Sequence, residues 1–146
     1  MRILGLDVGR KRIGMAMSDP MAIVAQGVRS LEVKNEGDAL TQISGFIKEN
    51  SVGEAVVGLP LNMNGTEGPM TKEVRAFANK LKEKTGVPVK MWDERLTSLQ
   101  VERQLVFLDV SRAKRKKIND MLAAQIILQN YLDSKLRTQN SRLKYV

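Results

Sequence analysis

The order in which apolar patterns follow one another places the tightest constraint on the fold of this chain. Residues 2–8 form a near-continuous apolar run, which is typical of a strand that is buried on both faces. Residues 12–18 alternate between apolar and polar side chains, and residues 23–33 form a third, less regular run. We therefore expect the chain to open as an antiparallel meander of three strands.

Helical and strand-like patterns then alternate along the rest of the chain. This order predicts an α/β fold with a mixed five-stranded sheet, in which three antiparallel strands are followed by αβαβα with helices on both faces. The predicted elements after the third strand are a helix at 38–50, a strand at 55–59, a helix from 70 to Gly86, a strand at 87–92, a helix at 98–108 and a helix at 116–136.

The length of 146 residues fits one domain. We expect that domain to span residues 1–136, followed by a polar, frayed tail over residues 137–146. No apolar run approaches the ~20 residues that a membrane span needs, and the N-terminus lacks the layout of a signal peptide. The sequence therefore predicts a cytoplasmic protein with no membrane partner. It does not fix the oligomeric state, and we expect a monomer or a weak homodimer.

Cysteine and histidine are both absent from the sequence. Their absence excludes disulfides, Cys/His zinc sites, nucleophiles activated by histidine and any imidazole base. Chemistry in this chain must therefore use carboxylates, lysine, hydroxyl groups or a metal ion held by oxygen atoms.

The charge of the chain indicates its partner. Lys and Arg number 24 against 16 Asp and Glu, which gives a net charge of +8 and favours polyanions such as nucleic acid. A highly charged, solvated surface is the alternative, but two separate basic clusters flank candidate carboxylates. The residues predicted to contact nucleic acid are Arg10, Lys11, Arg12, Arg95, Arg112, Lys114, Arg115, Lys116 and Lys117.

Three carboxylates stand at positions where a charge needs an explanation. Asp7 lies at the end of a strand that otherwise reads as buried, where a charge is costly unless it is paired or bound to a cation. Glu94 directly follows the fifth predicted strand. Asp120 lies near the start of an apolar helix, and Ala123 and Ala124 share its face. Each has an ordinary alternative as a turn or helix-terminus acid.

Together these three carboxylates predict a catalytic metal site. Asp7, Glu94 and Asp120 come from separate elements, and we expect the fold to bring them within reach of one or two shared ions. Mg²⁺ prefers oxygen ligands and keeps several waters, so a few carboxylates suffice, and Mn²⁺ would serve as well. The sequence predicts a Mg²⁺- or Mn²⁺-dependent nuclease that acts on structured nucleic acid.

Four blocks of the sequence closely resemble the YqgF family, whose members are described as pre-16S rRNA nucleases and Holliday-junction-resolvase-like proteins. The resemblance covers nearly the whole chain, with the blocks in the family's order. The blocks are GLDVG at 5–9 with RIGMAMSD at 12–19, VVGLPLNMNGTEGP at 56–69, DERLTS at 93–98, and KKINDMLAA at 116–124 with ILQNYLD at 127–133.

The resemblance implies a ribonuclease H-like fold and catalytic roles for Asp7, Glu94 and Asp120. It also implies a part in maturing the 5′ end of pre-16S ribosomal RNA. One position departs from the family pattern, because Asn64 stands where the family often has Asp. That residue is therefore not expected to bind metal here.

Other functions remain open beside this one. A DNA resolvase that cuts Holliday junctions is one alternative, and an RNA-binding protein with weak catalysis on a nuclease fold is another. A P-loop is excluded, because Met15 and Ala16 stand where Lys and Ser or Thr must follow Gly14. Actin-like ATPases share this opening topology but need two such domains, and this chain is too short for them.

Overall fold

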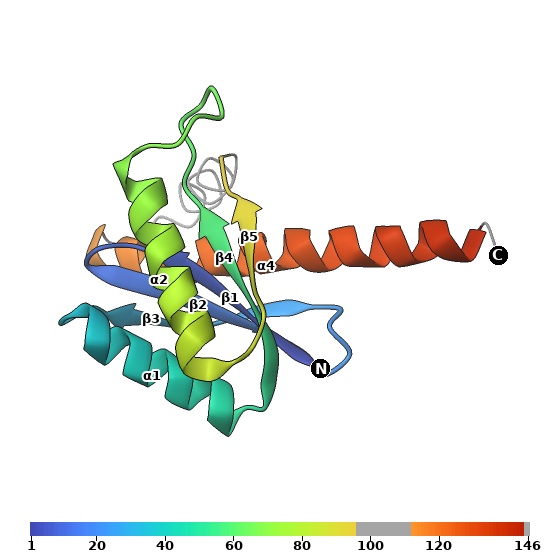
Figure 1. The fold of residues 1–146 in the computed structure, drawn as a ribbon, viewed down its shortest axis with the longest axis horizontal. Helices are drawn as coiled ribbons and strands as arrows, with labels where there is room; N and C mark the ends of the chain where they lie inside the picture. Colours follow the sequence, from blue (N-terminus) through green and yellow to red (C-terminus); the bar gives the residue numbers. More distant parts are fainter. Residues whose placement is uncertain (96–111, 145–146) are drawn as a thin grey trace.

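A computed structural model of the chain describes residues 1–95 and 112–144. One five-stranded sheet runs through it in the order β3-β2-β1-β4-β5 (Figure 1). The first three strands are antiparallel to one another, and β4 and β5 run parallel to β1. The elements are β1 (Arg2–Val8), β2 (Arg12–Ser18), β3 (Ala25–Glu32), α1 (Glu36–Glu49), β4 (Val52–Leu59), α2 (Pro69–Thr85), β5 (Val89–Asp93) and α4 (Arg112–Lys144).

One face of the sheet is covered by α1 and α2. Side chains alternate along β1, so that Leu4 and Leu6 point to this face and pack with Ile43 of α1 and Leu81 of α2. Helix α2 ends where the sequence predicts, because Gly86 adopts the left-handed conformation with φ of 73°. This larger core is aliphatic apart from Phe77 and the partly buried Phe46 packed against it.

Helix α4 crosses the opposite face, and it owes its close approach to glycine. A Cβ on Gly5 would lie 2.7 Å from Cβ of Leu128, and one on Gly27 would lie 3.3 Å from Cε of Met121. A Cβ on Gly14 would overlap the backbone of Asp120. The helix buries its own apolar face here, with Ala124, Ile127, Leu128 and Leu132 almost wholly enclosed. Figure 1 shows that α4 continues well beyond the sheet.

The fold class is confirmed: the sheet is mixed, its first three strands are antiparallel, and helices cover both faces. The bounds of the last helix were wrong at both ends. It begins at Arg112, so the basic cluster at 112–117 belongs to its first turns and does not precede it. It continues through 137–144, which was expected to fray, and that stretch contains no Pro or Gly to end it.

Two further expectations concern the helix at 98–108 and the absence of a membrane span. The helix predicted at 98–108 lies outside the described residues. Within the described part of the chain, no helix has the length and apolar character to cross a membrane.

Candidate active site

Asp7 and Glu94 meet on the face of the sheet that α4 covers. Asp7 is the last residue but one of β1, and the alternation of that strand turns it away from Leu6 and Val8 toward α4. Glu94 follows β5 directly, and its backbone N–H lies 3.5 Å from the carbonyl oxygen of Leu59. Gly58 of β4 lies against the Glu94 carboxyl, where any Cβ would overlap its Oε2 atom. A glycine at the end of β4 therefore makes room for the Glu94 side chain.

The pKa values of both carboxyl groups are raised, mainly by burial. Burial raises the pKa of Asp7 to about 6, and the negative charge of Asp120 contributes to the rise. Burial raises the pKa of Glu94 to about 8, helped by the charge of Asp7 and by a hydrogen bond with it. The pair therefore retains a shared proton near neutral pH. Two carboxyls are thus held together in a setting that disfavours their combined charge.

Asp120 lies beside this pair but has partners of its own. Its Oδ2 atom accepts a hydrogen bond from Nε of Arg12 at 2.7 Å and another from Oγ of Ser30 at 3.0 Å. Its position follows from the sheet register, in which Asp7 pairs with Gly14 and Gly14 pairs with Ser30. Asp120 sits above Gly14 in that row.

The geometry therefore brings the three predicted carboxylates to one region without arranging them around a common point. Asp120 is close enough for its charge to raise the pKa of Asp7. Across residues 1–95 and 112–144, however, no three acidic side chains are grouped so that they could jointly hold a metal ion. The bonds from Arg12 and Ser30 explain this, because they direct the Asp120 carboxylate toward β2 and β3.

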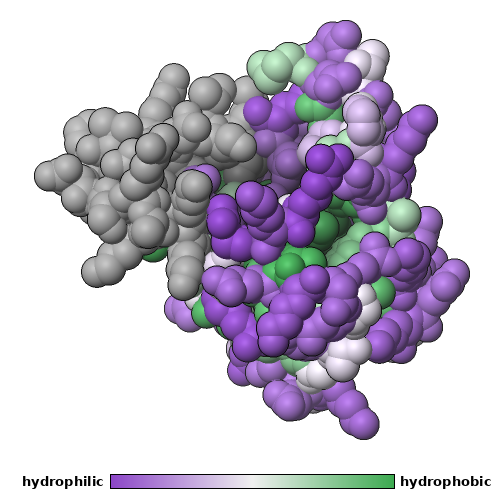
Figure 2. Space-filling model, turned by 90° about the vertical axis from the view of Figure 1, so that its left-hand side faces the viewer, coloured by the Kyte–Doolittle hydropathy of each residue, from purple (hydrophilic) through white to green (hydrophobic). Residues whose placement is uncertain are grey.

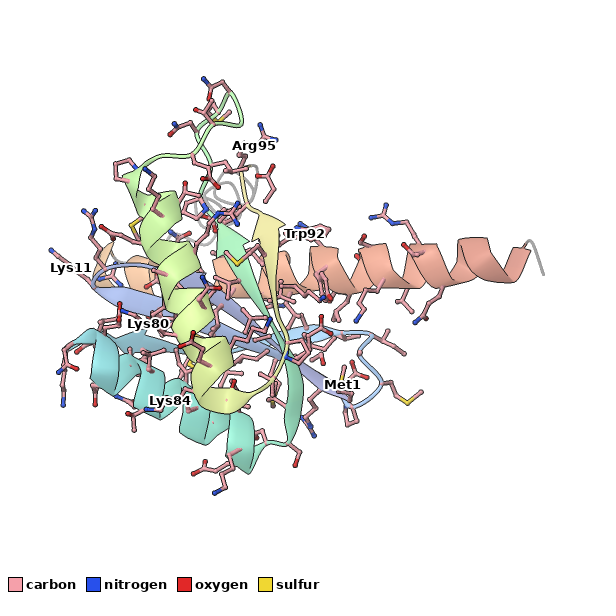
Figure 3. All side chains as sticks on the ribbon, in the orientation of Figure 1. Met1, Lys11, Lys80, Lys84, Trp92 and Arg95 are labelled. Carbon is pink, nitrogen blue, oxygen red and sulfur yellow. The ribbon has the colours of Figure 1, made fainter. Side chains whose placement is uncertain are left out.

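The predicted basic residues fall into three groups. Arg10 pairs with Glu73 at 2.9 Å, and Arg95 pairs with Asp93 at 2.7 Å, both on the surface. Lys11 projects from the β1–β2 turn, and Arg95 lies beside the loop that follows β4 (Figure 3). Arg12 differs from them, since it is bonded to Asp120. The five residues Arg112, Lys114, Arg115, Lys116 and Lys117 lie in the first turns of α4, and their side chains are outside the described part.

Two neighbouring polar residues have local structural roles. Asp93 accepts hydrogen bonds from the backbone and the guanidinium of Arg95, so it does not join the carboxylate pair. Asn64 accepts from the backbone N–H and the hydroxyl of Thr66, which fixes the tip of the loop.

Sequence reasoning missed Ser30, Gly14 and Gly58 as parts of the site. The two glycines carried a usable signal, because a glycine inside a strand often marks the close approach of another backbone or side chain. Ser30 carried none. Its contact with Asp120 joins residues 90 positions apart and depends on the register of β3 against β2.

An apolar hollow opens near the site, on the other face of the sheet. It has a volume of about 280 Å³, and its floor includes Val8, Ile13 and Phe77. Figure 2 shows it as a hydrophobic depression ringed by hydrophilic side chains. Arg10 and Glu73 stand at its edge. Because Val8 points away from Asp7, the hollow is separate from the carboxylates.

This sheet order, with acidic residues at the carboxyl ends of β1 and β5 and a helix crossing above them, defines a ribonuclease H-like domain. Solved resolvases share the fold. The Thermus thermophilus RuvC structure superposes with a TM-score of 0.58 over 94% of this chain and 98% of that chain, at 15% identity. The yeast mitochondrial Holliday junction resolvase superposes with a TM-score of 0.58 over 99% of this chain and 84% of that chain, at 12% identity.

Sequence comparison then identifies the family. The model of the RuvX family, described as Holliday junction resolvase, matches residues 1–134. A Clostridioides difficile protein is 50% identical over 94% of this chain and 97% of its own length. A protein from Caldanaerobacter subterraneus is 52% identical over 92% of this chain and 97% of its own length. Both are named "Putative pre-16S rRNA nuclease". The chain belongs to the RuvX family, which confirms the resemblance found in the sequence.

Proposed function

We propose that this protein is a nuclease that hydrolyses phosphodiester bonds in structured RNA and that precursor 16S ribosomal RNA is its substrate. The observation that carries the proposal is the partly buried pair of Asp7 and Glu94 beside Asp120, at the edge of a ribonuclease H-like sheet. The names of relatives about 50% identical over nearly the whole chain support the substrate. We propose residues 1–136 as the catalytic domain.

A divalent cation fits the chemistry of this site. Two partly buried carboxyls that share a proton are a place where a cation of the right size can replace that proton. All the candidate ligands are oxygen atoms, which suits Mg²⁺ or Mn²⁺ and not softer metals. We propose that Asp7 and Glu94 hold the ion and that Asp120 becomes a ligand when its carboxylate turns from Arg12.

The cation and the residues around it would have distinct roles in hydrolysis. When bound, the cation would polarise a phosphate oxygen and neutralise charge that develops during hydrolysis. Asp7 is fixed by its strand, and Glu94 is positioned by the gap at Gly58. Basic residues on the β1–β2 turn and in the first turns of α4 would hold the phosphate backbone.

A DNA resolvase activity is the second candidate. The description of the family model and the shared fold of solved resolvases favour it. The names of relatives that are far closer in sequence favour the RNA substrate. A direct comparison of a precursor 16S RNA fragment with a four-way DNA junction at equal concentrations decides between them.

Mutation of the carboxylates tests the proposal. Asp7→Asn and Asp120→Asn should each abolish Mg²⁺-dependent cleavage of the RNA fragment while leaving RNA binding largely intact. Asp133→Asn is the matched control, because it removes an exposed carboxylate from the same helix α4 as Asp120. Cleavage by wild type should stop on chelation and return with Mg²⁺ or Mn²⁺. Full activity in Asp7→Asn, or activity that survives chelation, would contradict the proposal. A protein that binds RNA but cleaves nothing would point to a binding role.

A further inference from the structure

Arg12 forms an ion pair with Asp120, one of the three carboxylates that we propose as metal ligands. It is the first residue of β2, and Nε of its guanidinium lies 2.7 Å from Oδ2 of Asp120 in α4. The Ser30 hydroxyl donates to that same oxygen at 3.0 Å. The Arg12 and Asp120 side chains are 30% and 18% exposed, so the ion pair is sheltered but open to solvent on one side. Salt and water screen such a pair less than a surface pair.

A divalent cation and Arg12 would compete for Asp120. Both carry positive charge, and both would use the same small group of acidic side chains. A cation held by Asp7 and Glu94 would repel the guanidinium while attracting the Asp120 carboxylate. Ser30 is neutral and donates from β3, so it can stay bonded to Asp120 in either arrangement. The guanidinium would then be left beside the cation without its counter-ion.

We propose that Arg12 is the resident counter-ion of Asp120 and that a divalent cation displaces it, so that the released guanidinium binds a phosphate of the nucleic acid. This inference rests on the proposed function. Arginine suits both states, since its planar fork pairs equally well with carboxylate and with phosphate. The exchange couples the two ligands, because each favours the state in which Arg12 has left Asp120. Metal binding and nucleic-acid binding therefore strengthen each other.

The first test measures metal binding without nucleic acid. Mg²⁺ is titrated into wild type, Arg12→Gln and Arg29→Gln, and the rise in melting temperature gives the affinity. Arg12→Gln removes the competing cation, so it should bind Mg²⁺ about fivefold more tightly, or better, than wild type. Arg29 is the matched control, because it is exposed on β3 and pairs with Met15 in the register. Arg29→Gln should bind Mg²⁺ with the same affinity as wild type.

The second test measures the salt dependence of binding to an RNA hairpin, with Mg²⁺ at a fixed concentration and with chelator. In Mg²⁺, Arg12→Gln should flatten the slope of log affinity against log salt by about 0.9 for one lost phosphate contact. In chelator the slopes of Arg12→Gln and wild type should be equal, because Asp120 of wild type still holds Arg12 away from phosphate. Arg12→Lys keeps the charge and protects the test against a folding defect. It should fall between wild type and Arg12→Gln in both measurements.

The outcomes separate this inference from the proposed function. If wild type is stabilised by Mg²⁺ but Arg12→Gln binds it equally or more weakly, Arg12 only positions Asp120, and the inference is overturned. An Arg12→Gln slope that is unchanged in Mg²⁺ also overturns it. If wild type does not respond to Mg²⁺ at all, the metal site in the proposed function fails, and the inference fails with it.

Discussion

Gly14 lies directly beneath Asp120, so closely that a methyl group on Gly14 would overlap the carbonyl group of Asp120. The contact is with the backbone of α4, which has no rotamer by which to move aside. The neighbours of Gly14 in the sheet register are Asp7 and Ser30. Because Gly14 has no side chain, α4 can bring the Asp120 carboxylate close to Asp7.

Gly14→Ala should destabilise the protein. The added methyl group must push the first half of α4 away from the sheet, and overpacking of this kind costs about 1–3 kcal/mol. The displacement also carries Asp120 away from Asp7, so Mg²⁺ should stabilise the variant less than wild type. Urea unfolding with and without Mg²⁺ measures both effects.

The control is Gly45→Ala in the middle of α1. Nothing lies within 4 Å of a Cβ placed there, and alanine is the better helix former. This variant should gain about 0.5–1 kcal/mol of stability. Equal effects of the two substitutions would mean that the close contact at Gly14 does not govern the position of α4.

The metal-free protein should lose stability as the pH rises from about 5 to 8. The pKa values of Asp7 and Glu94 are raised from the ordinary 3.8 and 4.5 to about 6 and about 8. The folded state therefore holds these protons more tightly than the unfolded state. Its advantage is complete below the unfolded pKa values and disappears as the pH passes the folded ones. Each unit of pKa difference corresponds to about 1.4 kcal/mol.

Urea unfolding at several pH values in chelator measures this slope. Asp7→Asn should make it shallower, because it removes one titrating group and the charge that acts on Glu94. Mg²⁺ should stabilise wild type more at pH 8 than at pH 5, since it competes with the protons. A stability that is flat or rises across this range would show that the two carboxyls are not held together.

The basic cluster in the first turns of α4 should supply affinity that does not depend on nucleic-acid sequence. Replacing Lys114, Arg115 and Lys116 with Gln should flatten the slope of log affinity against log salt by about 2–3 units if all three contact phosphate. Filter binding to an RNA duplex at several salt concentrations measures the slope. An unchanged slope would assign the cluster to a solvated surface.

Tyr131→Phe should destabilise the protein by about 1–3 kcal/mol, because it removes a hydrogen bond to a buried carboxylate. Glu54 of β4 is only 5% exposed, and its partners are the hydroxyl of Tyr131 and Nζ of Lys135 at 3.0 Å. Thermal unfolding measures the loss. Glu54→Gln in the same background should cost less than it does in wild type, because the shared bond is already gone. Strictly additive losses would contradict the shared contact.

Much of the fold was predictable because it depends on local patterns. The apolar run of β1, the helical spacing of α2 and its glycine stop each act over a few residues. The position of Asp7 at the end of a buried strand also marked it as a candidate site residue. The end of α4 was misplaced because its polar helix formers carry no apolar period beyond the sheet.

The sequence by itself determined the class of sheet, the family, and which acidic side chains are candidates for the chemistry. Only the tertiary structure decided how those side chains are partnered. It paired Asp7 with Glu94, and it gave Asp120 to Arg12 and Ser30. The Arg12–Asp120 contact spans 108 positions in the chain. Such contacts depend on strand register and on the depth at which α4 rests over Gly14, and neither leaves a periodic signal in the sequence.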